Sequence, residues 1–241
     1  MPETLIKDRG IISAMFNSIA GSYDLLNHLL SLGIDRRWRK RLIKHLALSA
    51  HKKALDVASG TGDIALALYR EGVEVTGIDI AQKMLDKAVE KSSKVAKTNT
   101  PLPVFILASA DEIPFEDNTF DAVTIGFGIR NFEKREQSLK EIFRVLNPEG
   151  QLAILEFASP KNKLWRALYT FYFHNILPVV GKIISKDMSA YTYLPESVSE
   201  FPQYEELCGE MKSVGFVTVN FQPLTGGVAV LYTAKKQSVK N

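Results

Sequence analysis

A short apolar strand that runs directly into a glycine-rich turn limits this chain to few folds. The strand is predicted over residues 54–58, Gly60 and Gly62 flank Thr61 in the turn, and a helix with apolar periodicity is expected from Ile64. Glycines allow a ligand to approach the backbone closely, and the first amides of a helix are free to bind it. The order of elements predicts a parallel α/β unit with a ligand at the end of its strand.

Strands and helices then alternate along most of the chain, which favours a parallel sheet covered by helices on both faces. A helix is expected between residues 203 and 213, and the last two strands follow it around Gly226-Gly227. Their short connection predicts an antiparallel pair. The expected fold is α/β: a seven-stranded, mostly parallel Rossmann-like sheet with a C-terminal antiparallel pair, an N-terminal helical cap and inserted helices. The strands after the first are predicted at 73–79, 104–108, 120–125, 151–157, 217–221 and 228–232.

No linker divides the 241 residues, so we expect one domain over 1–241. In the cap, Asp35 is expected to cap a third helix. Residues 147–150 have turn chemistry, and after Pro160 the chain reads as helical to Lys186, followed by a more polar stretch over 187–195. The expected parts are a helical cap (1–50), a cofactor-binding core (51–158), a helical substrate-side insertion (159–202) and a C-terminal helix with strands (203–241).

Composition excludes several classes of protein. The chain is 46% hydrophobic and 24% charged, which is typical of a globular domain. The single cysteine, Cys208, excludes an intramolecular disulfide, and no cluster of metal ligands is seen, so no metal is expected. Thirty basic and 27 acidic residues give a net charge of +3, so we expect no nucleic-acid partner. There is no apolar run of about 20 residues and no apolar signal core, so a cytoplasmic protein is expected.

Acidic residues at the ends of two further strands complete the predicted binding site. Asp79 ends the second strand, where a carboxylate can accept both hydroxyls of a ribose, although it could also cap the next helix. Asp111 follows the third strand and could accept from an adenine amino group, or be a surface turn residue. Asp56 could bind the ligand or satisfy loop amides. The residues expected to bind the nucleoside cofactor are Asp56, Gly60, Thr61, Gly62, Asp79, Ser109, Ala110, Asp111 and Gly126.

Dehydrogenases and methyltransferases both use such a turn. Ala65 replaces the third glycine of the dinucleotide pattern, which is only mild evidence against NAD because alanine is permitted there. Tyr232 and Lys236 have the spacing of a short-chain dehydrogenase pair, but they lie on a predicted strand, where that spacing does not build the helical pair. The C-terminal antiparallel strands resemble the sheet of class I S-adenosylmethionine-dependent methyltransferases, which favours that class.

Four segments carry a resemblance to one family. The chain resembles the ubiquinone/menaquinone biosynthesis C-methyltransferases in Tyr-Asp-Leu-Leu-Asn at 23–27, Ile-Gly-Phe-Gly-Ile-Arg-Asn at 125–131, Arg-Val-Leu-Asn-Pro at 144–148, and Tyr-x-Tyr-Leu with Ser-Val and Phe-Pro at 191–202. It departs from the family where Asp35 replaces a usual histidine, where Asn147-Pro148-Glu149 replaces Lys-Pro-Gly, and where Ala158 replaces a serine.

The resemblance implies S-adenosyl-L-methionine as cofactor and a polyprenyl hydroquinone as substrate. Demethylmenaquinol, methylated on a ring carbon to menaquinol, is the first choice. The methoxy-benzoquinol intermediate of ubiquinone synthesis is the alternative, and some members of the family methylate both. Two other readings stay open: a methyltransferase acting on another molecule, such as a sterol, a small amine or tRNA, and a nucleoside-binding subunit without activity. A tRNA enzyme would be expected to have a basic face.

Attack by a ring carbon requires loss of a hydroxyl proton, stabilisation of the phenolate and a dry pocket. The residues expected on the catalytic side are Arg130, Asn131, Tyr191 and Tyr193. The Arg130 guanidinium keeps its proton at ordinary pH, so it is a poor general base. We expect it to stabilise the phenolate or to hold a water molecule. It could instead be a structural arginine paired with Glu133 or Asp24. The two tyrosines could orient the quinol oxygens or be core aromatics.

The aromatic stretch at 164–173 has two readings as well. It is either a buried helix face or a surface for the isoprenoid tail and the membrane that holds it. Lys161, Lys163 and Arg166 could then lie near lipid phosphates. We therefore expect peripheral contact at the inner face of the membrane at most. The oligomeric state is left open.

Overall fold

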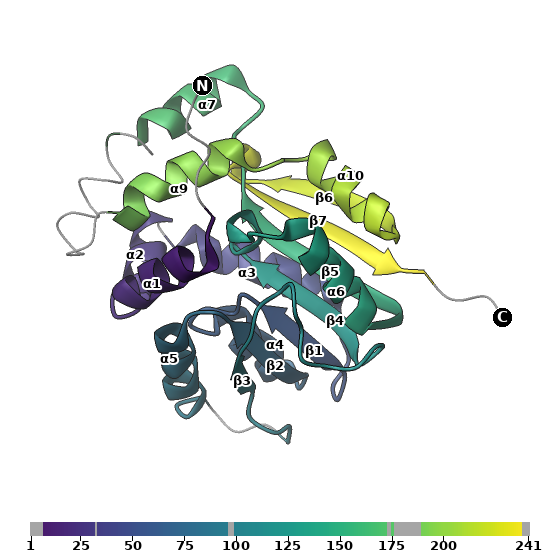
Figure 1. The fold of residues 1–241 in the computed structure, drawn as a ribbon. Helices are drawn as coiled ribbons and strands as arrows, with labels where there is room; N and C mark the ends of the chain where they lie inside the picture. The colour runs from purple at the N-terminus through teal and green to yellow at the C-terminus, as the bar shows by residue number, and fades with distance from the viewer. Residues whose placement is uncertain (1–6, 32, 96–98, 173–174, 176–188, 238–241) are drawn as a thin grey trace.

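A single seven-stranded sheet organises the protein in the computed structural model, which describes residues 7–31, 33–95, 99–172, 175 and 189–237 (Figure 1). The strand order is β3-β2-β1-β4-β5-β7-β6, and β7 runs opposite to the other six strands, so it pairs antiparallel with both β5 and β6. This confirms the predicted mostly parallel sheet and its C-terminal antiparallel pair. The strands are β1 (Lys53–Val57), β2 (Glu74–Asp79), β3 (Val104–Leu107), β4 (Phe120–Gly126), β5 (Leu146–Phe157), β6 (Phe216–Leu224) and β7 (Ala229–Lys236).

Helices cover both faces of the sheet because each presents one apolar side to it. The apolar residues of α3 and α4 pack on one face, and those of α6 and α10 pack on the other. The cap helix α1 packs on α5 and α9 near the carboxyl ends of the strands (Figure 1). The helices are α1 (Arg9–Ile19), α2 (Tyr23–Leu30), α3 (Ile34–Leu46), α4 (Asp63–Arg70), α5 (Gln82–Ser92), α6 (Arg135–Val145), α7 (Lys163–Phe171), α9 (Ser189–Glu200) and α10 (Glu205–Val214), with short 3-10 turns η1 (Ile129–Asn131) and η3 (Thr225–Gly227).

Two local predictions need correction. The cap of α3 is Gly33, in the left-handed region at φ 72°, whereas Asp35 is buried in the first turn and pairs with Arg39. The turn expected at 147–150 is an irregularity inside β5, because Phe120 pairs with Leu146 but Ala122 already pairs with Gln151.

The helical segment expected after Pro160 is α7, which ends at Phe171. Much of the remainder of that segment, residues 173–174 and 176–188, lies outside the described residues. The polar stretch continues into α9, which contains Tyr191, Tyr193 and Pro195.

Candidate active site

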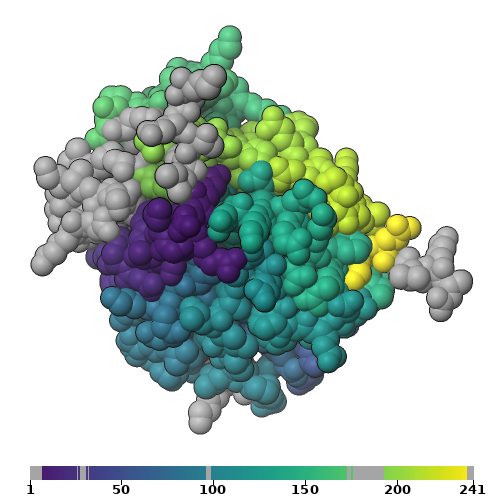
Figure 2. Space-filling model, in the orientation of Figure 1, coloured from purple at the N-terminus to yellow at the C-terminus, as the bar shows by residue number. Residues whose placement is uncertain are grey.

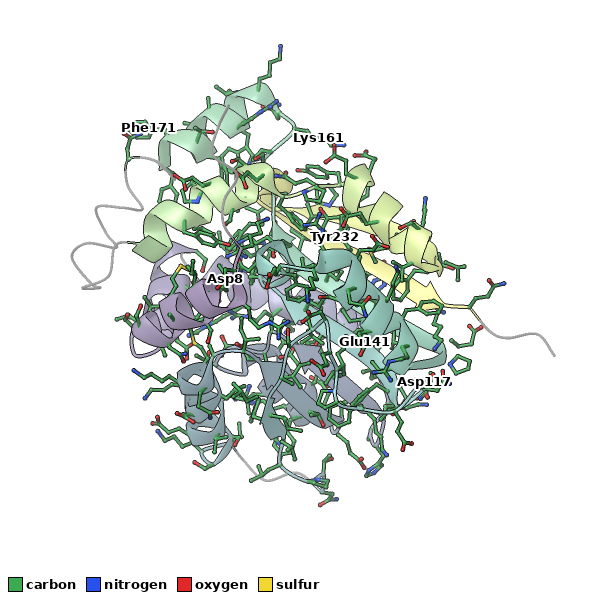
Figure 3. The ribbon with its side chains drawn as sticks, viewed as in Figure 1. Asp8, Asp117, Glu141, Lys161, Phe171 and Tyr232 are labelled. Atoms are coloured by element: carbon green, nitrogen blue, oxygen red, sulfur yellow. The ribbon has the colours of Figure 1, made fainter. Side chains whose placement is uncertain are left out.

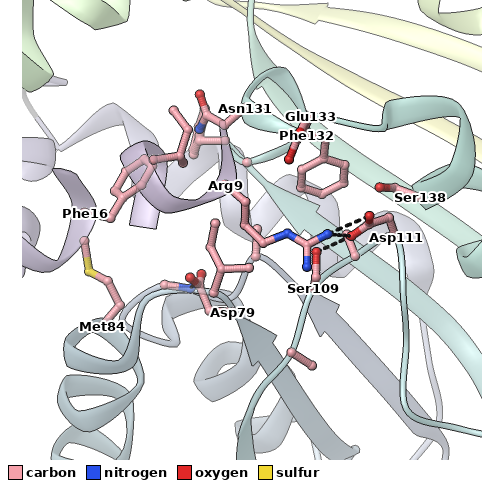
Figure 4. Close-up of a pocket in the computed structure, with 18 of the residues that line it drawn as sticks. Arg9, Phe16, Asp79, Met84, Ser109, Asp111, Asn131, Phe132, Glu133 and Ser138 are labelled. Carbon is pink, nitrogen blue, oxygen red and sulfur yellow. Dashed lines mark hydrogen bonds and ion pairs between the residues drawn. The ribbon is translucent and has the colours of Figure 1, made fainter. Parts of the chain in front are cut away.

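A pocket of about 750 Å³ of open space lies at the carboxyl ends of the central strands, beside α1. Figure 2 shows α1, in purple, on the surface between the blue-green residues of the core and the light-green residues of α9. Figure 4 shows the main lining side chains. Those labelled there are Arg9, Phe16, Asp79, Met84, Ser109, Asp111, Asn131, Phe132, Glu133 and Ser138.

Backbone without side chains forms one side of this pocket. Gly60 and Gly126 both line it, together with Ala110 from the loop after β3. A Cβ added to Gly126 would lie 2.4 Å from Cδ1 of Ile64, so a side chain there would collide with α4. These positions let a ligand approach the main chain, as the glycine turn predicts.

Gly62 is tightly packed within the turn, and replacing it should lower the stability of the protein. Its φ is 79°, and an added Cβ would lie 2.9 Å from Cβ of Ala88 and 3.0 Å from Cζ of Phe105. We expect Gly62→Ala to lower the free energy of unfolding by about 1–3 kcal/mol. Gly209 is the matched control, since it lies in α10 with open space around it, and Gly209→Ala should raise stability by about 0.5–1 kcal/mol. Urea unfolding measures both, and equal effects of the two substitutions would contradict the account.

The Asp79 carboxylate lies at the end of β2 and lines the pocket. Its Oδ2 accepts from the amide of Gly60 at 2.8 Å, and its Oδ1 accepts from the amide of Ala81 at 2.9 Å. Burial raises the pKa of this carboxyl, while these amides oppose the shift. The helix-cap alternative for Asp79 is wrong, because the N-cap residue of α5 is Ala81. Asp79 accepts from the Ala81 amide and lines the pocket.

Asp111 lies across the pocket and is bound by a residue that the sequence did not single out. Nη2 of Arg9, in α1, donates to both carboxylate oxygens at 2.7 Å, and the Ser109 hydroxyl donates to Oδ1 (Figure 4). Burial alone would raise the pKa of Asp111, but the Ser109 hydrogen bond and the Arg9 charge outweigh it and lower the pKa. Asp111 is therefore tied to α1 rather than being a free surface turn residue.

Asp56 and Thr61 lie in a smaller recess next to the main pocket, which also shares Gly60 and Gly126. The hydroxyls of Thr124 and Ser59 donate to the Asp56 carboxylate at 2.6 and 2.7 Å. The Thr61 hydroxyl donates to Asp24 in α2, so the turn is bonded to the cap.

The buried Asp56 gives a prediction for the pH dependence of stability. Burial raises its pKa to about 6, although the hydrogen bonds from Thr124 and Ser59 oppose the shift. The pKa of an unfolded aspartate is about 3.9, so the folded state binds more protons between these values. The contribution of Asp56 therefore makes the free energy of unfolding rise as the pH falls from about 6 to about 4. Asp56→Asn should remove this part of the slope in unfolding titrations, and an unchanged slope would rule it out.

Arg130 follows β4 in η1 and is buried, with its side chain 7% exposed. Nη1 lies 2.7 Å from Oε1 of Glu156, whose side chain is fully buried, and also donates to the carbonyl of Phe127. Nε donates to the Ser197 hydroxyl of α9. The alternative ion-pair partners expected from the sequence, Glu133 and Asp24, are wrong, because the carboxylate that holds Arg130 is Glu156.

Asn131 lines the main pocket directly after Arg130. The hydroxyl of Tyr193, in α9, donates to Oδ1 of Asn131 at 3.0 Å. Burial raises the pKa of Tyr193 to about 12, so the tyrosine is a neutral donor at ordinary pH. The structure thus brings two of the expected substrate-side residues together, whereas the side chain of Tyr191 lies outside the described residues.

Several pocket residues were missed from the sequence because they belong to ordinary helical faces. Phe16 and Met84 face the pocket from α1 and α5, and Phe132 follows η1 (Figure 4). Their apolar spacing predicts only a helix and its buried side. Arg9 carries no local signal either, since its partner Asp111 is 102 residues away.

The dehydrogenase alternative finds no support at Tyr232. Tyr232, labelled in Figure 3, is fully buried in β7, and its hydroxyl accepts from the amide of Tyr204, the residue before α10. It is a core residue rather than a dehydrogenase acid. Within the residues that the structure describes, no group of three or more histidine, cysteine or acidic residues could hold a metal ion. No helix in the same residues is long and apolar enough to span a bilayer.

The sheet order and the pocket define a Rossmann-like methyltransferase fold. A solved structure of a SAM-dependent methyltransferase from Aquifex aeolicus is similar, with a TM-score of 0.59 and 20% identity over 82% of this chain and 88% of that one. At this identity the likeness shows the fold alone.

Sequence comparison defines the family. The model of the ubiE/COQ5 methyltransferase family matches residues 3–236, and this chain belongs to that family. It is 44% identical to the ubiquinone/menaquinone biosynthesis C-methyltransferase UbiE of Geotalea daltonii, over 93% of this chain and 96% of the relative. It is 42% identical to the demethylmenaquinone methyltransferase of Porphyromonas gingivalis, over 93% of this chain and 92% of the relative.

Proposed function

We propose that this protein transfers a methyl group from S-adenosyl-L-methionine to a ring carbon of a reduced polyprenyl quinone, with demethylmenaquinol as its first substrate. The observation that carries the proposal is one pocket, in a chain of the ubiE/COQ5 family, that has a strand-end carboxylate on one wall and a polar amide on another. The relative from P. gingivalis bears the name of the demethylmenaquinone enzyme, and the one from G. daltonii is named for both quinones.

The residues around the pocket fit S-adenosyl-L-methionine. The carboxylate at the end of β2 suits the two ribose hydroxyls, and the bare backbone at Gly60 and Gly126 leaves room for the nucleoside. The apolar side chains of Phe16 and Met84 suit an aromatic base. The residues we assign to the cofactor are Asp56, Gly60, Thr61, Gly62, Asp79, Ser109, Ala110, Asp111 and Gly126.

The cofactor supplies an electrophilic methyl group when bound. The chain has to hold the quinol so that its ring carbon faces that group, and to keep water out while the ring hydroxyl loses its proton. We assign the quinol oxygens to Asn131, supported by Tyr193, and Tyr191 to the same side. Arg130 acts as a positioning residue, since its bonds to Glu156 and Phe127 fix the turn that presents Asn131.

A substitution at Tyr193 tests the assignment of the substrate side. Tyr193→Phe removes one hydrogen bond to Asn131, worth about 0.5–1.5 kcal/mol, and should raise KM for the quinol about three- to tenfold. Binding of S-adenosyl-L-methionine, measured by calorimetry, should stay unchanged. Weaker binding of the cofactor together with an unchanged KM for the quinol would reverse the assignment.

The benzoquinol of ubiquinone synthesis is the second candidate, favoured by the name of the G. daltonii relative. The purified protein should be given methyl-labelled cofactor with reduced demethylmenaquinone and, separately, with the reduced demethylated methoxy-benzoquinone. Label only in the naphthoquinol supports the first proposal, and label in both supports a dual substrate range. Label in the benzoquinol alone would overturn the first choice.

We also propose that residues 1–241 form one methyltransferase domain, which works in the cytoplasm and has no nucleic-acid partner. Because a polyprenyl tail dissolves in the bilayer, the proposal includes peripheral contact with the inner face of the membrane.

A further inference from the structure

The α7 helix exposes an apolar stripe. Leu164, Leu168 and Phe171 are 75%, 55% and 60% exposed, and their spacing of four and three residues puts them on one side of the helix. Figure 1 shows α7 as an outlying element, and Figure 3 shows Lys161 and Phe171 near its two ends. A contiguous apolar stripe at the surface indicates an interaction site.

The α3 helix exposes a face made of cations. Its apolar side, with Trp38, Leu42 and Leu46, is buried against the sheet. Arg39, beside that face, is already paired with Asp35 and Asp63. In the part of the chain that the structure describes, no ion pair is found for the five exposed cations of this helix. These are Arg36, Arg37, Lys40, Arg41 and Lys44.

The helices α3 and α7 are both bonded to one residue of the β6–β7 connection, α3 through Trp38 of its buried side. The Trp38 indole donates to the hydroxyl of Thr225 at 2.9 Å, and the Trp165 indole donates to the carbonyl of the same Thr225 at 3.2 Å. One tryptophan comes from α3 and the other from α7. The sequence around α7 adds positive charge through Lys163 and Arg166, and it has no acidic residue between Glu156 and Asp187.

We propose that the five cations of α3 and the three apolar residues of α7 form one surface, the α3–α7 surface, that docks on an anionic lipid bilayer. Its chemistry matches that partner in two ways. Lipid phosphates attract the cations, and the apolar stripe enters the boundary between headgroups and acyl chains. Stable peripheral binding requires two such signals together. Because α7 follows the carboxyl end of β5, docking brings the pocket's edge of the sheet to the membrane.

The role of this surface, which is access to a membrane-dissolved quinol, rests on the proposed function. Its binding to lipid does not, and can be tested without any substrate. The probe is a vesicle of 70% phosphatidylcholine and 30% phosphatidylglycerol, with pure phosphatidylcholine vesicles as comparison, in a sedimentation assay. We expect binding to the anionic vesicles that is at least tenfold stronger than to the neutral ones and that weakens steeply at high salt. Equal binding to both vesicles, or none to either, would overturn the proposal.

Two variants and two matched controls locate the binding. Lys40→Glu with Lys44→Glu, and separately Leu164→Ser with Leu168→Ser, should each reduce binding about tenfold or more. Lys212→Glu with Lys235→Glu makes the same change in net charge elsewhere. Val89→Ser with Leu102→Ser removes two comparably exposed apolar side chains elsewhere. Both controls should bind within twofold of the natural protein, and a control that loses as much binding as its test variant contradicts the proposal.

A second copy of this chain is the competing occupant of the α7 stripe. If Leu164→Ser with Leu168→Ser converts a dimer to a monomer in sedimentation equilibrium and leaves vesicle binding unchanged, the stripe is a protein interface and the proposal fails. Activity separates the two proposals. The variants should methylate a short-tailed, water-soluble quinol at the natural rate and a vesicle-embedded quinol more slowly. If the natural protein methylates neither quinol but the variants still lose vesicle binding, the proposed function fails and the α3–α7 surface stands.

Discussion

Asp79→Ala is expected to weaken the binding of S-adenosyl-L-methionine about 100-fold or more. A carboxylate that accepts two ribose hydroxyls makes two charge-assisted hydrogen bonds, each worth about 1.5–3 kcal/mol. The substitution also removes the acceptor that fixes the amide of Gly60 at 2.8 Å, so the glycine turn loses part of its order. Isothermal titration calorimetry measures the affinity directly.

Asp86 provides the control for that experiment. It is an acidic residue of α5, seven positions further along the chain, and its side chain is exposed and bonded to Gln82. Asp86→Ala removes the same charge without touching the pocket and should change cofactor affinity by less than twofold. If Asp79→Ala binds the cofactor within threefold of the natural protein, the ribose assignment is wrong.

Arg130→Ala is expected to destabilise the protein by about 3–5 kcal/mol and to abolish most of its turnover. The loss of stability follows because the Glu156 carboxylate, fully buried, is left without its cation. Turnover falls because the turn that carries Asn131 is no longer held by the Arg130 bonds to Glu156 and Phe127. Urea unfolding and a methyl-transfer assay at low temperature measure the two effects.

A double substitution separates stability from positioning. Arg130→Leu with Glu156→Leu removes both charges, and apolar pairs of this kind are often as stable as the ion pair that they replace. We expect it to recover most of the stability lost in Arg130→Ala and to bind the cofactor nearly as well as the natural protein, yet to turn over slowly. Full recovery of turnover would show that Arg130 matters only for folding.

The sheet could be predicted because its signals are local. Each central strand is a short apolar run bounded by a turn, and Gly62 and Asp79 occupy positions that the strand–turn–helix pattern fixes on its own. The cap of α3 could not be predicted in this way. Aspartate is a favourable capping residue, but Gly33 occupies the cap position in the left-handed conformation. The buried Asp35 carboxylate instead accepts a hydrogen bond from Arg39.

The candidate site was predictable only where a residue's position in the sheet decides its role. Arg130 was singled out, but its partner depends on β4 and β5 being neighbours with Gly126 opposite Leu155, which places Glu156 beside the start of η1. Arg9 comes from a helix that precedes the sheet, and no periodicity in α1 shows that it reaches Asp111. Contacts between distant segments therefore account for what the sequence missed.

Methyl transfer itself should be measured with ¹³C-methyl-labelled S-adenosyl-L-methionine and reduced demethylmenaquinone, with the product analysed by mass spectrometry and NMR. We expect one added methyl group, bonded to a ring carbon, and no product from the Asp79→Ala variant at a cofactor concentration that saturates the natural protein. A methyl group on a quinol oxygen, or no transfer by a protein that binds the cofactor and is supplied with fully reduced quinol, would contradict the proposed function.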